Sequence, residues 1–330
     1  MELIQYDRQA HGEQVFDLWQ KAVGEKYPLA LEDFLHLTNN RRSYEDGEGV
    51  IAVEADQVIG FGMVEADYKN PLWNRWGGIV ALLVDPARQR QGIGSALLER
   101  MEARMRQVGC KEMHLGETLG SFWPGAPLDL PAAELFFRRH GYDFSEGVGT
   151  DVAIALDGYE MTPAARRALQ EQGAEVRCTT PETLEAVCEF ERREFPDWYD
   201  GLLKNAGQNV EDIVAVWRGD EVIGSTIANT PPNHGMRERM VGSPAGGFGG
   251  VGIAEAWRGR GLGTAMCQWA ALYVKRRGGR YCLIDQIRPE LMGFYSRVGA
   301  EAWRSFCLGK KRVENQKRND YNEKDSGRRN

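Results

Sequence analysis

The stretch QRQGIGSA occupies residues 89–96, and a second stretch of the same design, RGRGLGTA, occupies residues 258–265. Each follows a short apolar strand, ending at Val84 or Ile253, and each opens an amphipathic helical pattern. Glycines and small residues in the first helical turn leave backbone N–H groups exposed at the positive end of the helix dipole. The chain therefore contains two predicted sites for a phosphate or pyrophosphate.

Length and composition favour two medium-sized globular domains. The chain has 330 residues, of which 42% are apolar and 27% are charged, and a domain spans roughly 100 to 200 residues. No apolar run approaches the roughly 20 residues of a membrane span, and residues 1–7 lack a basic region followed by an apolar signal core. We expect a cytoplasmic protein with no membrane partner.

Charge is unevenly distributed along the chain. The formal net charge is −7, but from Gly309 onward there are eight Lys/Arg against four Asp/Glu. The remaining acidic body disfavours nucleic acid as a partner and is compatible with a cationic amine. The tail is nearly devoid of apolar residues, so we expect residues 309–330 to be disordered.

The six cysteines are scattered, with no C-x-x-C spacing and no histidine cluster nearby. This pattern indicates reduced, mostly structural thiols and favours neither a disulfide framework nor a zinc site. We expect no metal site.

Both halves of the chain show the same order of predicted elements. A strand and a helical region precede two strands joined by a tight turn; a third strand, the glycine-rich turn, a helix, a further strand and a last helix follow. The polar stretch 157–173 separates the halves. We expect a first domain at residues 1–156, a linker at 157–173, a second domain at 174–308 and the tail at 309–330.

The two halves differ in the length of one loop. Phe137 follows Gly92 by 45 residues, whereas the matching Tyr295 follows Gly261 by 34, so the first half has 11 extra residues. The aromatic, proline-rich stretch 118–127 is the candidate for this insertion. It either lines a substrate pocket or covers the open side of the sheet.

Three phosphate-binding motifs compete for the glycine-rich turns. A P-loop needs G-x-x-x-x-G-K-[ST], and neither turn supplies that lysine. A dinucleotide fingerprint needs a third glycine three residues after Gly94 or Gly263, which both copies lack. The remaining pattern, Q/R-x-x-G-x-G/A after a strand, is matched fully by both copies.

This pattern resembles the acetyl-CoA-binding motif of the GCN5-related N-acetyltransferase (GNAT) family, and the order of elements around it resembles that fold. The resemblance covers residues 1–156 and 174–308. It implies an α/β (α+β) fold of two tandem domains, each a mixed, mostly antiparallel twisted sheet flanked by helices. It also implies acetyl-CoA as co-substrate.

In that family the strand before the turn pairs with the pantetheine arm, and the turn amides hold the pyrophosphate. The residues so implied in the first half are Leu82, Leu83, Val84, Arg90, Gln91, Gly92, Ile93, Gly94 and Ser95. Those implied in the second half are Val251, Gly252, Ile253, Gly259, Arg260, Gly261, Leu262, Gly263 and Thr264. A tight strand-to-helix turn without a ligand is the alternative interpretation.

Acetyl transfer to an amine requires a proton for the departing thiolate, and a phenol with a pKa of about 10 can supply it to a thiol with a pKa of about 8.5. The family commonly uses a tyrosine in a Phe/Leu-Tyr-x-x-x-Gly setting, which residues 294–299 match. This resemblance implies Tyr295 as the general acid. The matching Phe137 cannot donate a proton, so we expect the second domain to be catalytic and the first to bind acetyl-CoA only or to be structural.

The other chemical groups are less sharply defined. We expect a backbone N–H near Ile253 to stabilise the oxyanion. Asp285 is our candidate general base, with Glu255, Glu117 and His234 as alternatives, and each can equally be a structural charge. The long loop at residues 229–247 is either a substrate lid or disordered.

We therefore expect an acetyl-CoA-dependent N-acetyltransferase that acts on the primary amine of a small molecule by direct attack in a ternary complex, as a monomer or homodimer. Two alternatives stay open. One is a non-catalytic acyl-CoA-binding or sensing protein, and the other is a protein N-acetyltransferase.

Overall fold

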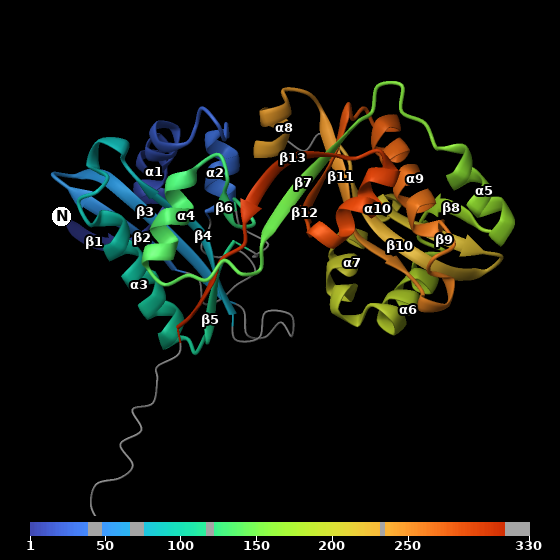
Figure 1. Cartoon of the computed structure of the whole chain (residues 1–330), viewed down its shortest axis with the longest axis horizontal. Helices are drawn as coiled ribbons and strands as arrows, with labels where there is room; N and C mark the ends of the chain where they lie inside the picture. Colours follow the sequence, from blue (N-terminus) through green and yellow to red (C-terminus); the bar gives the residue numbers. More distant parts are fainter. Residues whose placement is uncertain (39–47, 67–75, 117–121, 232–234, 314–330) are drawn as a thin grey trace, which may run out of the picture.

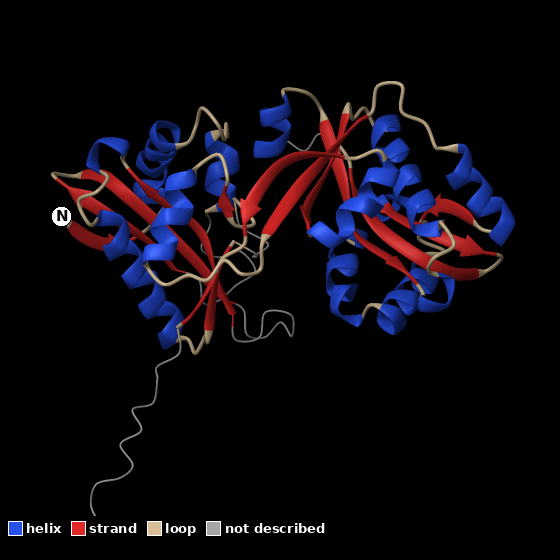
Figure 2. Cartoon of the chain, viewed as in Figure 1, coloured by secondary structure: helices blue, strands red, loops and turns tan. Residues whose placement is uncertain are grey.

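The computed structural model describes residues 1–38, 48–66, 76–116, 122–231 and 235–313. It shows two lobes side by side along the longest axis, each built around one β-sheet (Figure 1). Helices flank the strands in both lobes (Figure 2). The predicted fold class is confirmed, because both sheets are mixed and both are covered by helices.

The first sheet has six strands in the order β1-β2-β3-β4-β5-β14. All neighbours are antiparallel except β4 and β5, which are parallel and are connected through helix α3. The strands are β1 Glu2–Gln5, β2 Glu48–Glu54, β3 Gln57–Ala66, β4 Trp76–Val84, β5 Glu112–Leu115 and β14 Lys310–Arg312.

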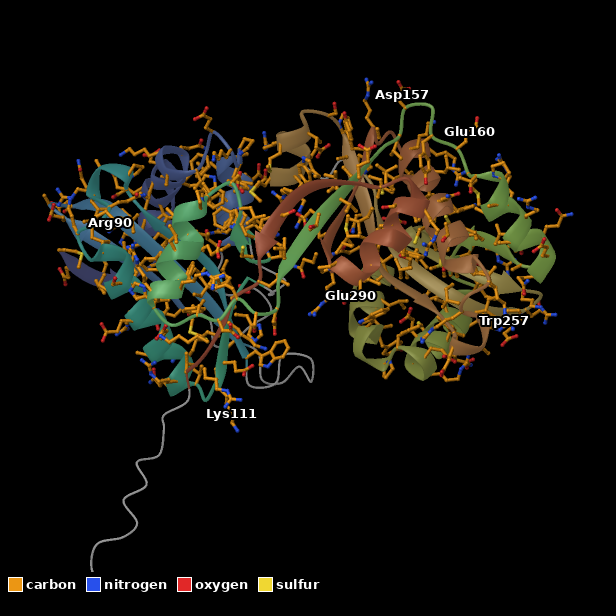
Figure 3. All side chains as sticks on the ribbon, viewed as in Figure 1. Arg90, Lys111, Asp157, Glu160, Trp257 and Glu290 are labelled. Carbon is orange, nitrogen blue, oxygen red and sulfur yellow. The ribbon has the colours of Figure 1, made fainter. Side chains whose placement is uncertain are left out.

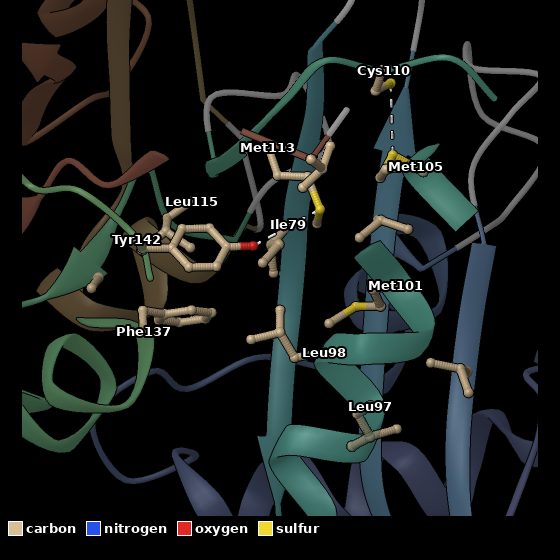
Figure 4. Close-up of a cluster of buried hydrophobic side chains, with 14 of the residues drawn as sticks. Ile79, Leu97, Leu98, Met101, Met105, Cys110, Met113, Leu115, Phe137 and Tyr142 are labelled. Atoms are coloured by element: carbon tan, nitrogen blue, oxygen red, sulfur yellow. Dashed lines mark hydrogen bonds between the residues drawn. The ribbon is translucent and has the colours of Figure 1, made fainter. Parts of the chain in front are cut away.

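Two apolar cores cover the two faces of this sheet. The period of two along β2 sends Ala52 to the core that holds Leu97 of α3, and sends Ile51 to the core that holds Trp19 of α1. Figure 4 shows the α3 side, where one face of the helix points its apolar side chains at the strands. The helices of this lobe are α1 Arg8–Ala22, α2 Leu31–Leu37, α3 Ile93–Gln107 and α4 Pro131–Arg139.

The second sheet has eight strands in the order β6-β13-β7-β12-β11-β10-β9-β8. Here β11 and β12 form the parallel pair, connected through α9. The strands are β6 Ala126–Pro127, β7 Val148–Ala155, β8 Glu175–Cys178, β9 Ile213–Arg218, β10 Glu221–Asn229, β11 Ala245–Ile253, β12 Tyr281–Ile287 and β13 Glu301–Cys307. The helices are α5 Pro163–Gln172, α6 Leu184–Glu194, α7 Tyr199–Ala206, α8 Met236–Val241, α9 Leu262–Arg276 and α10 Met292–Val298.

The two lobes exchange strands. β7, which precedes residue 156, lies in the second sheet between β12 and β13. β14, which follows residue 308, lies in the first sheet beside β5. The sheets therefore do not follow the expected division into residues 1–156 and 174–308, because the second sheet takes β6 and β7 from the first half of the chain and the first sheet takes β14 from the second half (Figure 1).

The beginning of the expected disordered tail is also ordered. Residues 310–312 form β14, and Val313 is buried in the first core. Lys311 Nζ forms an ion pair with Glu102 Oε1 of α3 at 2.7 Å. The basic residues of this segment thus bind acidic residues of the first lobe, and residues 314–330 lie outside the described ranges.

The described part of the 118–127 loop covers the sheet. Phe122 and Trp123 are buried in the α1-side core, and the Trp123 ring stacks on Trp19 with centroids 5.2 Å apart. Residues 117–121 lie outside the described ranges. Phe122 and Trp123 cover the sheet, because their rings fill the core between α1 and the strands, whereas Ala126–Pro127 form β6 beside β13.

The described part of the 229–247 loop joins the lobes. It contains α8, whose Met236 is buried in the α1-side core of the first lobe and whose Arg239 contacts Asp33 of α2 at 3.4 Å. Residues 232–234 lie outside the described ranges. Within those ranges, no helix is long and apolar enough to cross a membrane.

Candidate functional site

The two glycine-rich turns have the same backbone conformation. Gly92 and Gly261 are the N-caps of α3 and α9, with left-handed φ angles of 84° and 80°. The first helical hydrogen bonds run from Ala96 N to Gly92 O and from Ala265 N to Gly261 O, both at 3.0 Å. Three backbone N–H groups in each turn therefore precede the helical ladder and are available to an anion.

The second glycine of each turn lies under an aromatic ring. A Cβ added to Gly94 would lie 3.3 Å from Phe136, and one added to Gly263 would lie 3.4 Å from Phe294. Glycine at these positions lets α4 and α10 pack directly on the turns. Phe136 and Phe294 therefore pack on the turns. The aromatic residues that follow them, Phe137 and Tyr295, point into the apolar cores instead.

The first residue of the motif closes the turn. Gln89 Nε2 donates to the carbonyl oxygen of Val84 at 3.4 Å, and Arg258 Nε donates to that of Ile253 at 2.9 Å. Both side chains reach back to the last residue of the preceding strand. The alternation of Gln and Arg in the pattern follows from this geometry, because both residues offer a long side chain that ends in an N–H donor.

One turn residue adopts a strained backbone. Arg90 has a φ of 64°, where its counterpart Gly259 has a φ of 75°. A left-handed conformation costs a residue with a Cβ about 1 kcal/mol. Arg90 therefore keeps the conformation of the turn while presenting a cation there. Figure 3 shows that the two turns lie far apart, since Arg90 of the first turn and Trp257 beside the second turn are at opposite ends of the molecule.

In both sheets the parallel strands separate beside the turn. The last paired residues are Ile79 with Leu115 in the first sheet, and Gly247 with Leu283 in the second. The residues implied as pantetheine partners lie beyond these pairs, where β4 and β11 still bond to β3 and β10 on their other side. On the side of β5 or β12, the backbone groups of these residues therefore have no strand partner within the described ranges. These residues are Leu82, Leu83 and Val84 in β4, and Val251, Gly252 and Ile253 in β11.

A cavity of about 660 Å³ opens at the second turn. Six of the predicted residues line it: Ile253, Gly259, Gly261, Leu262, Gly263 and Thr264. The sequence reasoning missed its remaining lining residues, which are Thr162, Ala164, Ala165, Trp257, Arg258, Phe294 and Arg297. Three of these belong to α5 or its N-cap, in the segment expected to be only a linker.

Helix α5 is held against the cavity by specific contacts. Thr162 N and Oγ1 both donate to Gln268 Oε1 of α9, at 2.9 and 3.2 Å. Arg260 Nη1 donates to Gln172 Oε1 at 3.1 Å, and its guanidinium lies 5.0 Å from the Trp257 ring centroid. The cation predicted to face a pyrophosphate is therefore directed at α5 and Trp257 in this structure.

The remaining turn residues have distinct environments. Ile93 and Leu262 are buried in the cores, so they can offer a ligand only their backbone N–H groups. Ser95 Oγ lies 2.9 Å from Nε2 of His140, the C-cap residue of α4. Gln91 is exposed, whereas Thr264 lines the cavity.

Tyr295 and Phe137 occupy equivalent positions. Each is 7% exposed, and each ring lies edge-on to the preceding phenylalanine, with centroids 5.0 and 5.2 Å apart. Figure 4 shows Phe137 pointing into the first core beside Tyr142. Burial raises the pKa of Tyr295 above its ordinary value, and the nearby Cys267 acts in the same direction, so the phenol keeps its proton at neutral pH.

Asp285 lies in a group of charges between the lobes. Its Oδ2 accepts from Arg237 Nη1 of α8 at 2.7 Å, and Asp151 with Arg304 forms a second ion pair at 2.9 Å. Burial raises the pKa of Asp285 to about 6, against the opposing charge of Arg237. Asp285 is thus a carboxylate whose pKa lies near neutral pH, paired with a cation from the 229–247 loop.

The alternative candidates for the general base have different environments. Glu255 is exposed at the start of the short turn Glu255–Trp257, and Glu117 and His234 lie outside the described ranges. The sequence reasoning missed Glu191 of α6, which is buried and accepts a hydrogen bond from Ser225 Oγ. Burial raises the pKa of Glu191, and an isolated Glu on the inner face of an amphipathic helix was the signal for it.

These features fit a CoA ester. Nothing lies within 4 Å of a Cβ added to Gly92 or Gly259, whereas one added to Gly261 would lie 3.0 Å from Ala168 of α5. The cavity leads from the second turn to the strand end at Ile253. An extended chain that ends in a pyrophosphate requires this combination of an N–H cradle and an open strand edge.

Comparison with known proteins agrees with this geometry. The sequence matches the acetyltransferase (GNAT) family over residues 13–142 and 176–300. None of the curated proteins with which it was compared matches it.

Three solved structures align with nearly the whole of this chain. A glucosamine N-acetyltransferase region of a fungal multidomain GH3 β-N-acetylglucosaminidase has a TM-score of 0.82 and 24% identity over 94% of this chain, which spans 38% of that protein. A GCN5-related N-acetyltransferase from Sphaerobacter thermophilus has a TM-score of 0.68 and 18% identity, covering 95% of this chain and 96% of that one. A tandem GNAT protein from the clavulanic acid biosynthesis pathway has a TM-score of 0.66 and 17% identity, covering 95% and 99%. With the family match over both halves, the chain belongs to the acetyltransferase (GNAT) family and has its tandem two-domain form.

Proposed function

We propose that the protein is an acetyl-CoA-dependent N-acetyltransferase that acetylates the primary amine of a small molecule, with its main reaction centre in the second lobe. The observation that carries this proposal is the cavity at the second turn. It joins the N–H cradle of α9 to Ile253 at the end of β11, six residues beyond the last pair with β12. α10 brings Phe294 to the cavity, whereas Tyr295, its next residue, is buried in the core with Cys267 of α9 and is not among the lining residues.

The residues of the second lobe divide the reaction between them. Acetyl-CoA supplies a thioester, whose carbonyl carbon is attacked by a neutral amine. The N–H groups at residues 262–264 bind the pyrophosphate, and a backbone N–H near Ile253 bonds the carbonyl oxygen as it gains charge. As the C–S bond breaks, Tyr295 gives its proton to the sulfur.

A base must remove the proton that the amine loses on forming the amide bond. We assign this role to Asp285. Its pKa of about 6 leaves it ionised at neutral pH, yet high enough to accept a proton through water. The ion pair with Arg237 holds the carboxylate in place on β12, beyond the last residue that pairs with β11.

The acceptor class follows from charge and from one structural relative. The net charge of −7 favours a cationic amine. The relative with a TM-score of 0.82 is a glucosamine N-acetyltransferase region, so glucosamine is the first acceptor to test, followed by other amino sugars and polyamines.

The test is acetyl transfer by the full-length protein across a panel of amines. We expect thiol release from acetyl-CoA that depends on the amine, with the acetylated amine identified by mass spectrometry. A protein that binds acetyl-CoA and releases no thiol with any amine would support an acyl-CoA sensor. Transfer to peptide N-termini or lysines alone would support a protein acetyltransferase, and either result would overturn the proposal.

A further inference from the structure

The first lobe contains a buried acid and a buried imidazole in one row of its sheet. Glu65 of β3 pairs with Gly78 of β4, and Gly78 pairs with His114 of β5. Residues directly opposite one another point to the same face of a sheet. Glu65 is 3% exposed and His114 is 4% exposed. Gly78, which stands between them in the register, contributes no side chain to this row.

This row lies where the cofactor strand leaves its neighbour. The next pair, Ile79 with Leu115, is the last between β4 and β5. A bulge follows at once, since Val64 pairs with Ile79 while Met63 pairs with Ala81. Beyond the pair of Ile79 with Leu115, β4 continues without β5 to Leu82, Leu83 and Val84, the residues implied for the pantetheine arm.

The chemistry of the row belongs to the first lobe alone. The equivalent row in the second sheet is Asn229, Gly247 and Leu283, where β10, β11 and β12 pair. The glycine is kept in both lobes, but the titratable pair is replaced by an amide and an apolar side chain. Burying a carboxyl and an imidazole is costly, and such groups concentrate at functional sites.

The imidazole of His114 is held by its surroundings. Its ring stacks on Trp76 with centroids 4.4 Å apart and planes 22° apart. The Glu112 carboxylate lies 3.6 Å from His114 Nε2, and Lys310 of β14 is its register neighbour. The charged residues placed beside it thus include Glu112 of its own strand, Glu65 in the same row on β3, and Lys310 on β14, whose Nζ pairs with Glu146.

We propose that the first lobe is a second acetyl-transfer centre, in which His114 accepts the proton of the acceptor amine and Glu65 positions the imidazole or the ammonium group. The proposal rests on the proposed N-acetyltransferase function. The N–C bond forms as the C–S bond breaks, and the amine proton passes to His114 and then to solvent. The sulfur leaves as thiolate and takes its proton from solvent, because Phe137 cannot donate one.

The experiment measures acetyl transfer by the full-length protein to an amine that the wild type acetylates. Tyr295→Phe removes the acid of the second lobe and leaves the turnover of the first. In this background we compare His114→Gln, His114→Phe, Glu65→Gln, Glu65→Asp and, as the matched control, His11→Gln. His114→Phe keeps the ring against Trp76, so it preserves the packing while removing the proton acceptor.

We expect Tyr295→Phe to retain measurable turnover. In this background, both His114 variants and Glu65→Gln should lower the residual turnover at least tenfold, with the KM for acetyl-CoA unchanged. Glu65→Asp should restore part of the turnover lost in Glu65→Gln, and His11→Gln should have no effect.

Two outcomes overturn the inference. Either Tyr295→Phe has no residual turnover, or its residual turnover persists in both His114 variants with matching melting temperatures. In both cases the wild-type protein still acetylates the amine, so the proposed function stands. A wild type that acetylates no amine is the separate failure of the proposed function.

Discussion

Tyr295 is the residue on which the assignment of the second lobe most depends. Tyr295→Phe removes one oxygen from a side chain that is 7% exposed, and Phe137 shows that phenylalanine packs at this position. We expect a fall in kcat of about 100-fold, in the range for loss of a general acid, with unchanged acetyl-CoA affinity and melting temperature. Steady-state kinetics and calorimetry measure these quantities.

The control for this variant is Tyr281→Phe at the start of β12, which removes the same atom from a tyrosine on another element; neither tyrosine is among the residues that line the cavity. It should leave kcat unchanged. Full turnover in Tyr295→Phe would show that the phenol only packs in the core.

Asp285 gives a prediction about pH. Its pKa is raised to about 6 by burial, and a base must be ionised to act. The kcat of the wild type should therefore fall as pH decreases through about 6. Asp285→Asn should lower kcat by about 100-fold and remove this limb, while the alkaline dependence set by the acceptor amine remains.

Glu191 provides the comparison for the pH profile, because it is a buried carboxyl of the second lobe whose pKa is also raised by desolvation. If Glu191→Gln removes the acidic limb and Asp285→Asn keeps it, the base is Glu191. The ion pair of Asp285 with Arg237 would then only join α8 to the second sheet.

At the scale of elements, the glycine-rich turns were predictable and the surface around them was not. The left-handed N-caps at Gly92 and Gly261 follow from local sequence, since few residues other than glycine adopt that conformation easily. The contact of α5 with α9 through Thr162 and Gln268 joins segments 106 residues apart. No local pattern encodes such a contact, and for that reason α5 was expected to be only a linker.

The turns themselves can be tested by charge. Gly259→Asp and Gly92→Asp place a carboxylate beside the N–H cradle, in space where no atom lies within 4 Å of the new Cβ. Repulsion of the pyrophosphate should raise the Kd of acetyl-CoA at that site at least about tenfold, which corresponds to about 1.4 kcal/mol. Calorimetric titration of the wild type should show two sites, and each variant should lose one.

The matched control is Gly219→Asp in the β9–β10 turn. Gly219 also has a left-handed φ, of 58°, and open space around its Cβ position. This variant bears the same backbone strain and the same charge without a ligand nearby, so its acetyl-CoA binding should equal that of the wild type. Unchanged binding in both turn variants would contradict the cofactor assignment.

At the scale of the whole molecule, the sequence reasoning found two similar halves but not their exchange of strands. The expected order of elements ends each half at its last helix and includes no strand at residues 148–155, and a local pattern carries no information on which sheet accepts such a strand. Ala153 pairs with both Leu283 and Glu301, more than 100 residues away in sequence. Long-range pairing of this kind depends on which edges are open when the sheets form.

The exchange makes a prediction about dividing the chain. A fragment of residues 1–156 keeps β7 without its sheet and lacks β14 beside β5, while a fragment of residues 157–330 lacks β7 between β12 and β13. The break itself falls in an exposed loop at Asp157 and removes no strand. We therefore expect neither fragment to unfold cooperatively alone, because each sheet would be missing a strand that is bonded on one or both sides.

Co-expressed, the two fragments should restore both sheets. We expect them to copurify as a one-to-one complex with a Kd below about 1 μM, to melt in a cooperative transition, and to regain acetyl-CoA binding at both turns. The control is a division of the chain within the β9–β10 turn at Gly219, which separates strands that are neighbours in one sheet. If residues 1–156 and 157–330 each fold independently and bind acetyl-CoA, the lobes are autonomous and strands β7 and β14 do not join them.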